Sequence, residues 1–136
     1  MPRFLLLVSG PPSNAAPTLE VVEAMNRFNE ELSRAGALLS LDGLHPPAAG
    51  ARVRFAGGQP PTVTDGPFAE AKEVIGGYWV IRADSRDEAI AWAVKAPLSH
   101  DGTIEVRQIG EAADYPPEIA AAAQLDQLPP EQTTAD

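Results

Sequence analysis

Short apolar runs that end at Gly and Pro alternate with helix-spaced apolar residues over the first 110 residues of the chain. Residues 3–9 (RFLLLVS) precede Gly10-Pro11-Pro12, which predicts a strand followed by a loop. The next apolar residues recur at helical spacing, with Thr18 as the expected N-cap and Gly36 as the expected end. The chain therefore starts with a predicted strand and a predicted core helix.

The middle of the chain predicts a second strand and a hairpin. Residues 37–44 (ALLSLDGL) form an apolar run that ends at His45 and two prolines. Residues 52–55 and 61–64 flank Gly57-Gly58, a pattern typical of a β-hairpin. We interpret this hairpin as an insertion between core strands.

The later segments complete the pattern. A short polar helical segment is expected up to Glu73, before a strand over residues 78–81 (YWVI). Ser85 and Glu88 have the spacing of a capping box, which predicts a second helix that ends before the next proline. Residues 103–109 alternate strictly and form the last predicted strand.

The order of core elements is strand, helix, strand, strand, helix, strand, which predicts an α+β fold with a ferredoxin-like split βαβ arrangement and an inserted hairpin. Residues 3–9 and 78–81 are apolar on both faces, as central strands are, whereas residues 103–109 suit a sheet edge. Two helices cover one face of such a sheet. We therefore expect the other face to pack against a second copy, giving a homodimer.

Composition and charge divide the chain in two. Its 136 residues are 44% hydrophobic, enough for one folded domain. Residues 1–110 carry 13 acids and 10 bases, whereas residues 111–136 carry 6 acids and no base. We predict a domain over 1–110 and an acidic, Pro- and Ala-rich tail over 111–136. Because this charge repels phosphate backbones, nucleic acid is not an expected partner.

Several kinds of chemistry are excluded or unsupported. The chain has no Cys, which rules out disulfides, thiolate nucleophiles and Cys-ligated metals. No metal-binding spacing such as HxH or HExxH occurs, so neither a metal nor a cofactor is predicted. The apolar run at residues 4–8 is too short for a bilayer span or a signal sequence, which favours a cytoplasmic protein with no membrane partner.

One stretch resembles a known family. Residues 63–73 (VTDGPFAEAKE), followed by Gly76-Gly77-Tyr78, resemble the signature of the DGPF-domain branch of the YCII-related family. Residues 28–39 (FNEELSRAGALL) and 102–107 (GTIEVR) are similar to the same family, as is Gly43-Leu44 before its two prolines. The resemblance covers roughly residues 1–110 in order.

The resemblance implies a ferredoxin-like fold that dimerises as an α/β barrel. Members of the wider family carry a proposed catalytic His on the first helix and an Asp near the end of the second. The corresponding positions here hold Met25 and Ala96, neither of which can transfer a proton. Proteins of the DGPF branch are described as of unknown function, and some are encoded beside sigma factors, which favours a regulatory role.

Asp65, Gly66, Pro67 and Phe68 form the densest candidate site. In a ligand-binding interpretation, Asp65 supplies a carboxylate, Gly66 lets a ligand approach the backbone and Phe68 forms an apolar wall. In a structural interpretation, Asp65 caps a turn, Gly66 takes a positive φ, Pro67 starts a helix and Phe68 anchors it.

Four other side chains are candidates, each with a structural alternative. Lys72 is a candidate for an anionic ligand or a solvated helix face. Tyr78 offers a hydroxyl between the two sheets of a dimer, or belongs to the core. His45 and His100 are candidate acid–base groups or loop histidines.

The resulting function is a small-molecule-binding or regulatory homodimer, with Asp65, Gly66, Phe68, Lys72 and Tyr78 as ligand-binding candidates. The alternative is a cofactor-free lyase or isomerase that acts on a small polar substrate with Asp65 or His45 as base. A third hypothesis is an interaction module whose acidic tail docks on a basic partner.

Overall fold

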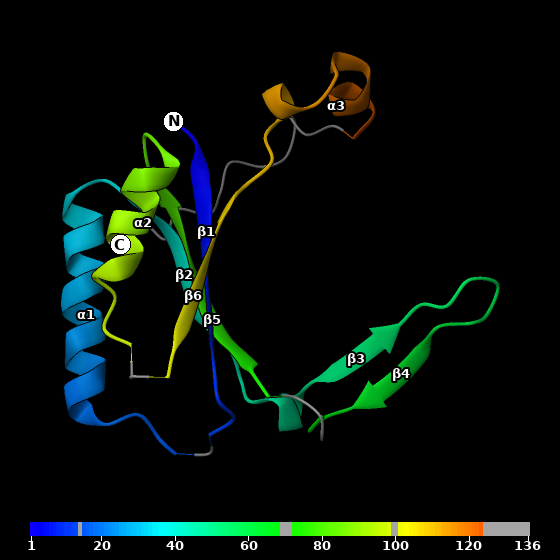
Figure 1. Ribbon diagram of the computed structural model, residues 1–136, viewed down its shortest axis with the longest axis horizontal. Helices are drawn as coiled ribbons and strands as arrows, with labels where there is room; N and C mark the ends of the chain where they lie inside the picture. The colour runs from blue at the N-terminus through cyan, green and yellow to red at the C-terminus, as the bar shows by residue number, and fades with distance from the viewer. Residues whose placement is uncertain (14, 69–71, 99–100, 124–136) are drawn as a thin grey trace.

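The computed structural model describes residues 1–13, 15–68, 72–98 and 101–123, which form a mixed α+β protein. Figure 1 shows helices α1 and α2 on one side of an antiparallel sheet, while none of the described helices packs on the opposite side of the sheet. The elements of these two layers are β1 (Arg3–Gly10), α1 (Leu19–Arg34), β2 (Leu38–Gly43), β5 (Val74–Arg82), α2 (Arg86–Val94) and β6 (Thr103–Gln108).

The four-stranded sheet has the order β2-β5-β1-β6, and each neighbouring pair is antiparallel. β1 pairs with β5 from Arg3 opposite Arg82 to Gly10 opposite Val74, with one irregularity after Val8. The predicted central position of the first and third core strands is confirmed. The predicted edge position of the last strand is confirmed as well.

The hydrophobic core lies between the sheet and the two helices. Its largest residues alternate along β1 and β5 and meet α1: Phe4, Leu6, Trp79, Ile81, Phe28 and Leu32. The ring of Trp79 packs edge to face on Phe28 with 5.3 Å between centroids, and its Nε1–H donates to the Asn29 side-chain oxygen at 2.8 Å. The only polar group of this indole is therefore satisfied inside the core.

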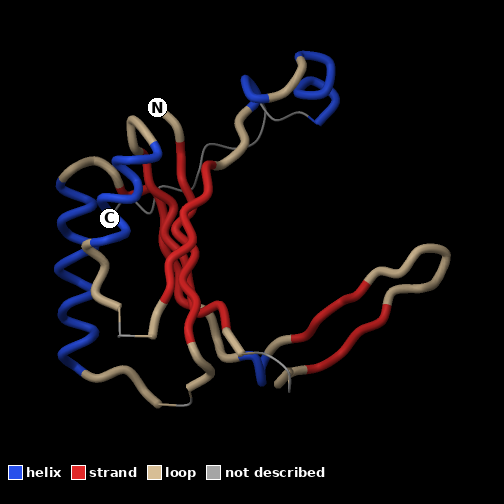
Figure 2. The backbone as a smooth tube through the Cα atoms, viewed as in Figure 1, coloured by secondary structure: helices blue, strands red, loops and turns tan. Residues whose placement is uncertain are grey.

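The second face of the sheet carries apolar residues that remain partly exposed. Leu5 lies opposite Val80, and Leu7 lies opposite Tyr78, on the side of β1 and β5 that points away from the helices. Figure 2 shows the same view, in which no described helix lies against this side of the sheet. We call this surface the open face. It matches the sequence prediction that both central strands are apolar on both sides.

The predicted helix caps form, with one difference. Thr18 accepts from the Val21 N–H at 3.2 Å, and Gly36, just beyond α1, has φ 71°. Ser85 accepts from the Glu88 N–H at 3.2 Å, but the Glu88 carboxylate accepts from the backbone N–H of Asp84 at 2.7 Å. The reciprocal half of the predicted capping box is therefore shifted by one residue.

The predicted hairpin is confirmed as a second, two-stranded sheet of β3 (Ala51–Arg54) and β4 (Thr62–Asp65). A short 3-10 turn, η1 (Pro47–Ala49), leads into it. Figure 1 shows that the hairpin extends away from the rest of the molecule. We call residues 51–65 the arm.

Beyond β6 the chain forms η2 (Ala112–Asp114) and α3 (Pro117–Ala123). Both elements lie within residues 111–136, the segment predicted as an acidic tail. Arg3 Nε donates to Glu111 Oε1 at 2.5 Å, which ties the start of this region to β1. Residues 124–136 of the predicted tail lie outside the described residues.

The helical segment predicted before Glu73 includes residues 69–71, which lie outside the described part of the chain. Phe68, Lys72 and Glu73 themselves lie in no helix. No helix among the described residues is long and apolar enough to cross a membrane.

Candidate functional site

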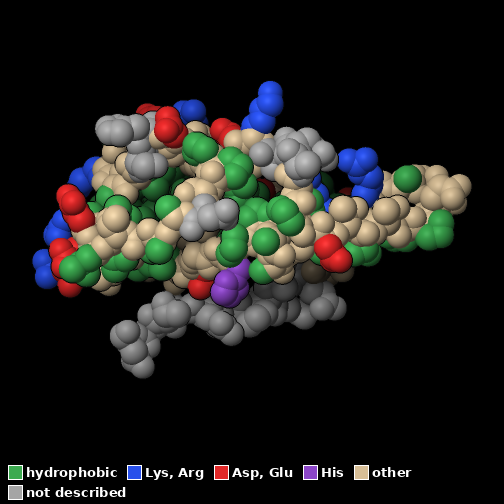
Figure 3. Space-filling model, turned by 90° about the horizontal axis from the view of Figure 1, so that it is seen from below, with side chains coloured by type: hydrophobic (Ala, Val, Ile, Leu, Met, Phe, Trp, Pro, Cys, Tyr) green, Lys and Arg blue, Asp and Glu red, His purple; other side chains and the backbone are tan. Residues whose placement is uncertain are grey.

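A pocket of about 830 Å³ lies at the end of the sheet where β1 ends and β5 begins. Its lining comes from the loop after β1, the loop after β2, the chain that leaves the arm at Pro67 and Phe68, and the connection between α2 and β6. Figure 3 shows the molecule from this end, where hydrophobic side chains (green) spread over the surface. Six of the lining residues are prolines: Pro11, Pro12, Pro17, Pro46, Pro47 and Pro67.

The prolines give this pocket a defined chemistry. Each proline fixes its own φ and has no backbone N–H, so the wall is stiff and poor in hydrogen-bond donors. The polar side chains on the wall come from Ser9, Ser13 and His45. Such a site suits a mostly apolar ligand with one or two polar groups.

Gly66 holds the base of the arm against the loop after β2. Its N–H donates to the Gly50 carbonyl at 2.9 Å. A Cβ at this position would lie 1.8 Å from the Pro47 carbonyl oxygen, a distance that backbone atoms cannot tolerate. Gly66 does not have the positive φ that the structural interpretation assigned to it, and Pro67, joined to it by a cis peptide bond, starts no helix. Glycine is needed at position 66 because the backbone there lies very close to the Pro47 carbonyl.

Phe68 connects the arm to the pocket. Its ring lines the pocket, and the guanidinium of Arg52 in β3 lies 3.9 Å from the ring centroid. A cation at this distance from an aromatic face is held by the ring quadrupole. Arg52 therefore fixes the Phe68 ring from the arm side.

The structure separates the predicted site residues. Phe68 and His45 line the pocket. Gly66 is not a lining residue, but it directly precedes Pro67, which is one. Asp65 is exposed at the end of β4, Lys72 is exposed before β5, and neither is among the lining residues. Tyr78 lies on the open face of the sheet. His100 lies outside the described residues.

The proline loops were missed as a site by sequence reasoning. Pro11-Pro12 and Pro46-Pro47 were interpreted as the ends of two strands. Because β1 and β2 run parallel on either side of β5, both pairs arrive at the same end of the sheet. The strand order, together with the positions of the two proline pairs, was the signal in the sequence that could have predicted this pocket.

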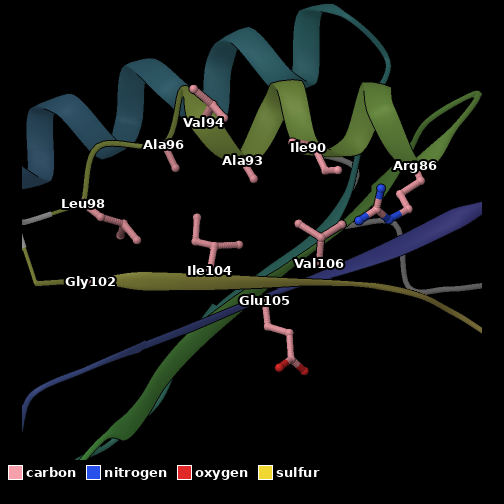
Figure 4. A pocket seen from close by; sticks show the side chains of 10 residues that line it. All are labelled: Arg86, Ile90, Ala93, Val94, Ala96, Leu98, Gly102, Ile104, Glu105 and Val106. Carbon is pink, nitrogen blue, oxygen red and sulfur yellow. The ribbon is translucent and has the colours of Figure 1, made fainter.

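A second hollow, of about 570 Å³, lies between α2 and the edge strand β6. Figure 4 shows Ile90, Ala93, Ile104 and Val106 along it, while Glu105 points away to the open face. None of the candidate site residues that the structure describes lines this hollow. The proline-lined pocket is therefore the candidate site.

Tyr78 takes part in the clearest polar contact on the open face. Asp42 of β2 lies opposite Tyr78, and the Tyr78 hydroxyl donates to Asp42 Oδ2 at 2.5 Å. This hydrogen bond, together with partial burial and the carboxylate charge, raises the pKa of Tyr78 above its ordinary value of 10.0. The phenol is thus held in its neutral, donating form.

The Tyr78–Asp42 contact predicts a measurable titration. In a Tyr115→Phe background, Tyr78 is the only tyrosine, and its tyrosinate absorbance is expected to appear above pH 10.0. Asp42→Asn is expected to lower this midpoint. Because the pKa of Tyr78 is raised in the folded state, its contribution to stability is present below pH 10.0 and is lost as pH rises through the folded pKa. An unchanged midpoint in Asp42→Asn would contradict the assigned cause.

The chain is similar to known proteins over most of its length. The family model for the YCII-related domain matches residues 2–113. The chain belongs to the YCII-related family. A protein of Rhizobium meliloti (strain 1021) named Uncharacterized protein R00369 is 36% identical over 91 residues, which is 65% of this chain and 73% of that protein. The matched region of this YCII-related protein includes the sheet, α1, α2 and the arm, and ends within η2.

Met25 and Ala96 occupy the places where the family resemblance put a catalytic His and Asp. In this YCII-related protein both side chains are partly buried and pack against the hydrophobic core. Neither lines the proline-lined pocket. Acid–base chemistry, if this protein performs any, has to use other residues.

Proposed function

We propose that this YCII-related protein is a homodimer of the DGPF branch that binds a small, mostly apolar molecule in the proline-lined pocket. The observation that carries the proposal is the pocket itself, about 830 Å³ in volume, with Phe68 on one wall and His45 on another. Its volume is typical of small-molecule sites, which are largely apolar with a few placed polar groups. The DGPF residues 65–68 lie at the point where the arm meets this pocket.

The ligand chemistry follows from the lining. A flat or cyclic hydrocarbon body matches the Phe68 ring and the proline rings, and one hydroxyl or carbonyl group matches Ser9, Ser13 or His45. Among the described residues, no Asp, Glu, Lys or Arg side chain lines the pocket, which argues against a highly charged ligand. Small aromatic or alicyclic compounds with one polar group are the proposed class.

The ferredoxin-like topology and the homodimer belong to the same proposal. Their support is the strand order β2-β5-β1-β6 with two helices on one face, together with an open face that carries Leu5, Leu7 and Val80. A second copy that packs its own open face on these residues removes apolar surface from water. Tyr78 then lies between the sheets of the dimer. The cytoplasm stays the predicted location.

A cofactor-free lyase or isomerase is the second candidate function. The observation that favours it is the position of His45 on a pocket wall, because an imidazole side chain can both accept and donate a proton. Asp65 is less well placed as the base, since it does not line the pocket. In this case the ligand is a substrate, and His45 acts on one of its carbon-bound protons.

A thermal-shift screen tests the binding proposal. A library of small aromatic and alicyclic alcohols, ketones and monocarboxylic acids is added to the protein, and hits are expected to raise its melting temperature. A ligand at 100 times its Kd stabilises the folded state by about 2.7 kcal/mol. Phe68→Ala is expected to abolish the response to every hit, while Val94→Ala, an exposed apolar residue on α2 that does not line the pocket, keeps it.

The same hits distinguish binding from catalysis. Each hit is incubated with the wild type and with His45→Ala, and its NMR spectrum is followed for conversion. Conversion by the wild type that is lost in His45→Ala supports the enzyme, whereas binding without conversion supports a binding protein. Hits that stabilise Phe68→Ala as much as the wild type would contradict the assignment of the pocket.

A further inference from the structure

The arm has two chemically different faces. Val53 lies opposite Val63 on one face, whereas Arg52 and Arg54 lie opposite threonines on the other. Every strand residue of the arm is exposed, and Phe55 beyond β3 is 79% exposed. An isolated two-stranded hairpin is only marginally stable in water. An arm with this much bare apolar surface therefore has the composition of a contact surface.

The region after β6 also exposes apolar residues, and it is acidic. We call residues 111–123 the α3 segment; it contains Tyr115 and Ile119, both exposed apolar residues. It carries three acids and no base in the sequence. Glu111 and Asp114 are used locally, because Glu111 binds Arg3 and Asp114 accepts from the Glu111 N–H. Glu118 makes no ion pair with any residue that the structure describes.

The arm and the α3 segment stand on the same side of the sheet. Figure 1 shows the arm at one end of the strands and α3 at the other, and both project from the side opposite α1 and α2. Together they frame the open face. A second copy packed on the open face would therefore lie between the arm and the α3 segment.

We propose that, in the homodimer, the arm of one copy docks on the α3 segment of the other. This inference rests on the proposed homodimer and specifies how its two copies are oriented. A twofold axis in the plane between the sheets either aligns the strands of the two copies or reverses them. Aligned strands bring arm to arm, whereas reversed strands bring each arm to the partner's α3 segment.

Charge selects the reversed arrangement. The arm carries two Arg and one Asp, a net charge of +1, and the α3 segment carries three acids, a net charge of −3. Arm against arm places like charges together, which disfavours the aligned dimer. Arm against α3 segment brings the Arg-bearing face of the arm to the acidic segment and pairs Arg54 with Glu118. The symmetry makes this contact twice in each dimer.

Charge reversal tests the contact. Arg54→Glu and Glu118→Arg are each expected to raise the dimer dissociation constant about tenfold, since an attraction becomes a repulsion at two symmetric places. The double variant is expected to return close to the wild-type value. Arg34→Glu, on the exposed side of α1, makes the same charge change far from the open face and serves as the matched control. Sedimentation velocity measures all four proteins and the wild type.

Cross-linking tests the geometry directly, because the natural chain has no Cys. Thr62→Cys places a thiol on the arm, and Ala121→Cys places one on an exposed position of α3. The two variants, one carrying a mass tag, are mixed and treated with a short bifunctional maleimide. The expected product is the mixed dimer, joined from the arm of one chain to the α3 segment of the other.

The other outcomes separate this inference from the proposed function. Cross-linking of Thr62→Cys to itself, or a wild-type dimer with no cross-link in the mixture, would overturn the docking of the arm and leave the homodimer in place. A wild type that sediments as a monomer would overturn both. Equal dissociation constants for the wild type and Arg54→Glu would also count against the docking.

Discussion

Replacing Trp79 by Ala is expected to lower the free energy of unfolding by about 3–5 kcal/mol, the largest effect of any substitution considered for this protein. The indole is 5% exposed, packs edge to face on Phe28 and donates its N–H to Asn29. Alanine leaves a cavity between β5 and α1 and removes the partner of the Asn29 amide. Urea denaturation followed by circular dichroism measures the change.

Phe55→Ala is the matched control for the aromatic deletion. Phe55 is 79% exposed on the arm, so its removal is expected to change the free energy of unfolding of the monomer by no more than about 0.5 kcal/mol. Asn29→Ala tests the polar half of the contact, and the buried indole N–H left without its partner is expected to cost about 1–3 kcal/mol. A loss under about 1 kcal/mol in Trp79→Ala would contradict the assigned core.

The layered fold could be predicted from the sequence because its central strands are apolar on both faces. Residues 3–9 and 78–81 show no polar side, which marks them as central strands of the sheet, while Glu105 and Arg107 mark β6 as an edge. Thr18 and Gly36 similarly predicted where α1 begins and ends. These signals are local, so a single sequence contains them.

The start of β5 could not be predicted because its signal is tertiary. Gly76 and Gly77 resemble a break before a strand, yet β5 begins at Val74 and includes both. A Cβ on Gly77 would lie 2.6 Å from the Asp42 carbonyl oxygen, so glycine permits β2 to approach β5 closely. The need for glycine at position 77 can be seen only when β2 is paired with β5.

The candidate site was predicted in part for the same reason. Phe68 and His45 stood out locally, and both line the pocket. The remaining wall comes from prolines in loops that are distant in sequence, and these loops meet only through the strand order. Tyr78 was predicted to offer its hydroxyl between the sheets of a dimer. Its place on the open face is compatible with this, which stays a prediction until the dimer is measured.

The base of the arm joins the two proposals made for this protein. Gly66 and Pro67 lie where the arm returns to the body, Arg52 reaches from the arm to the Phe68 ring, and that ring is a wall of the pocket. A partner that holds the arm also holds Arg52 over Phe68. Ligand binding and dimer contact are therefore expected to strengthen each other, because both favour the same placement of this ring.

Gly66→Ala is expected to abolish the ligand response of the pocket and to lower the free energy of unfolding by about 1–3 kcal/mol. The new methyl group would lie 1.8 Å from the Pro47 carbonyl oxygen, so the loop after β2 and the base of the arm have to separate. That separation weakens the hydrogen bond from the Gly66 N–H to the Gly50 carbonyl. It also moves Pro47 and Phe68, two walls of the pocket, away from each other.

Gly57→Ala is the control that isolates close approach from the general effect of adding a methyl group. It lies in the turn of the arm, its φ is not in the left-handed region, and a Cβ there meets no atom within 4 Å. Its free energy of unfolding and its ligand response are expected to stay at the wild-type values. If Gly66→Ala kept the response of the wild type to the same compounds, the pocket wall at Pro47 and Phe68 would not be the binding surface, because a ligand held there cannot tolerate their separation.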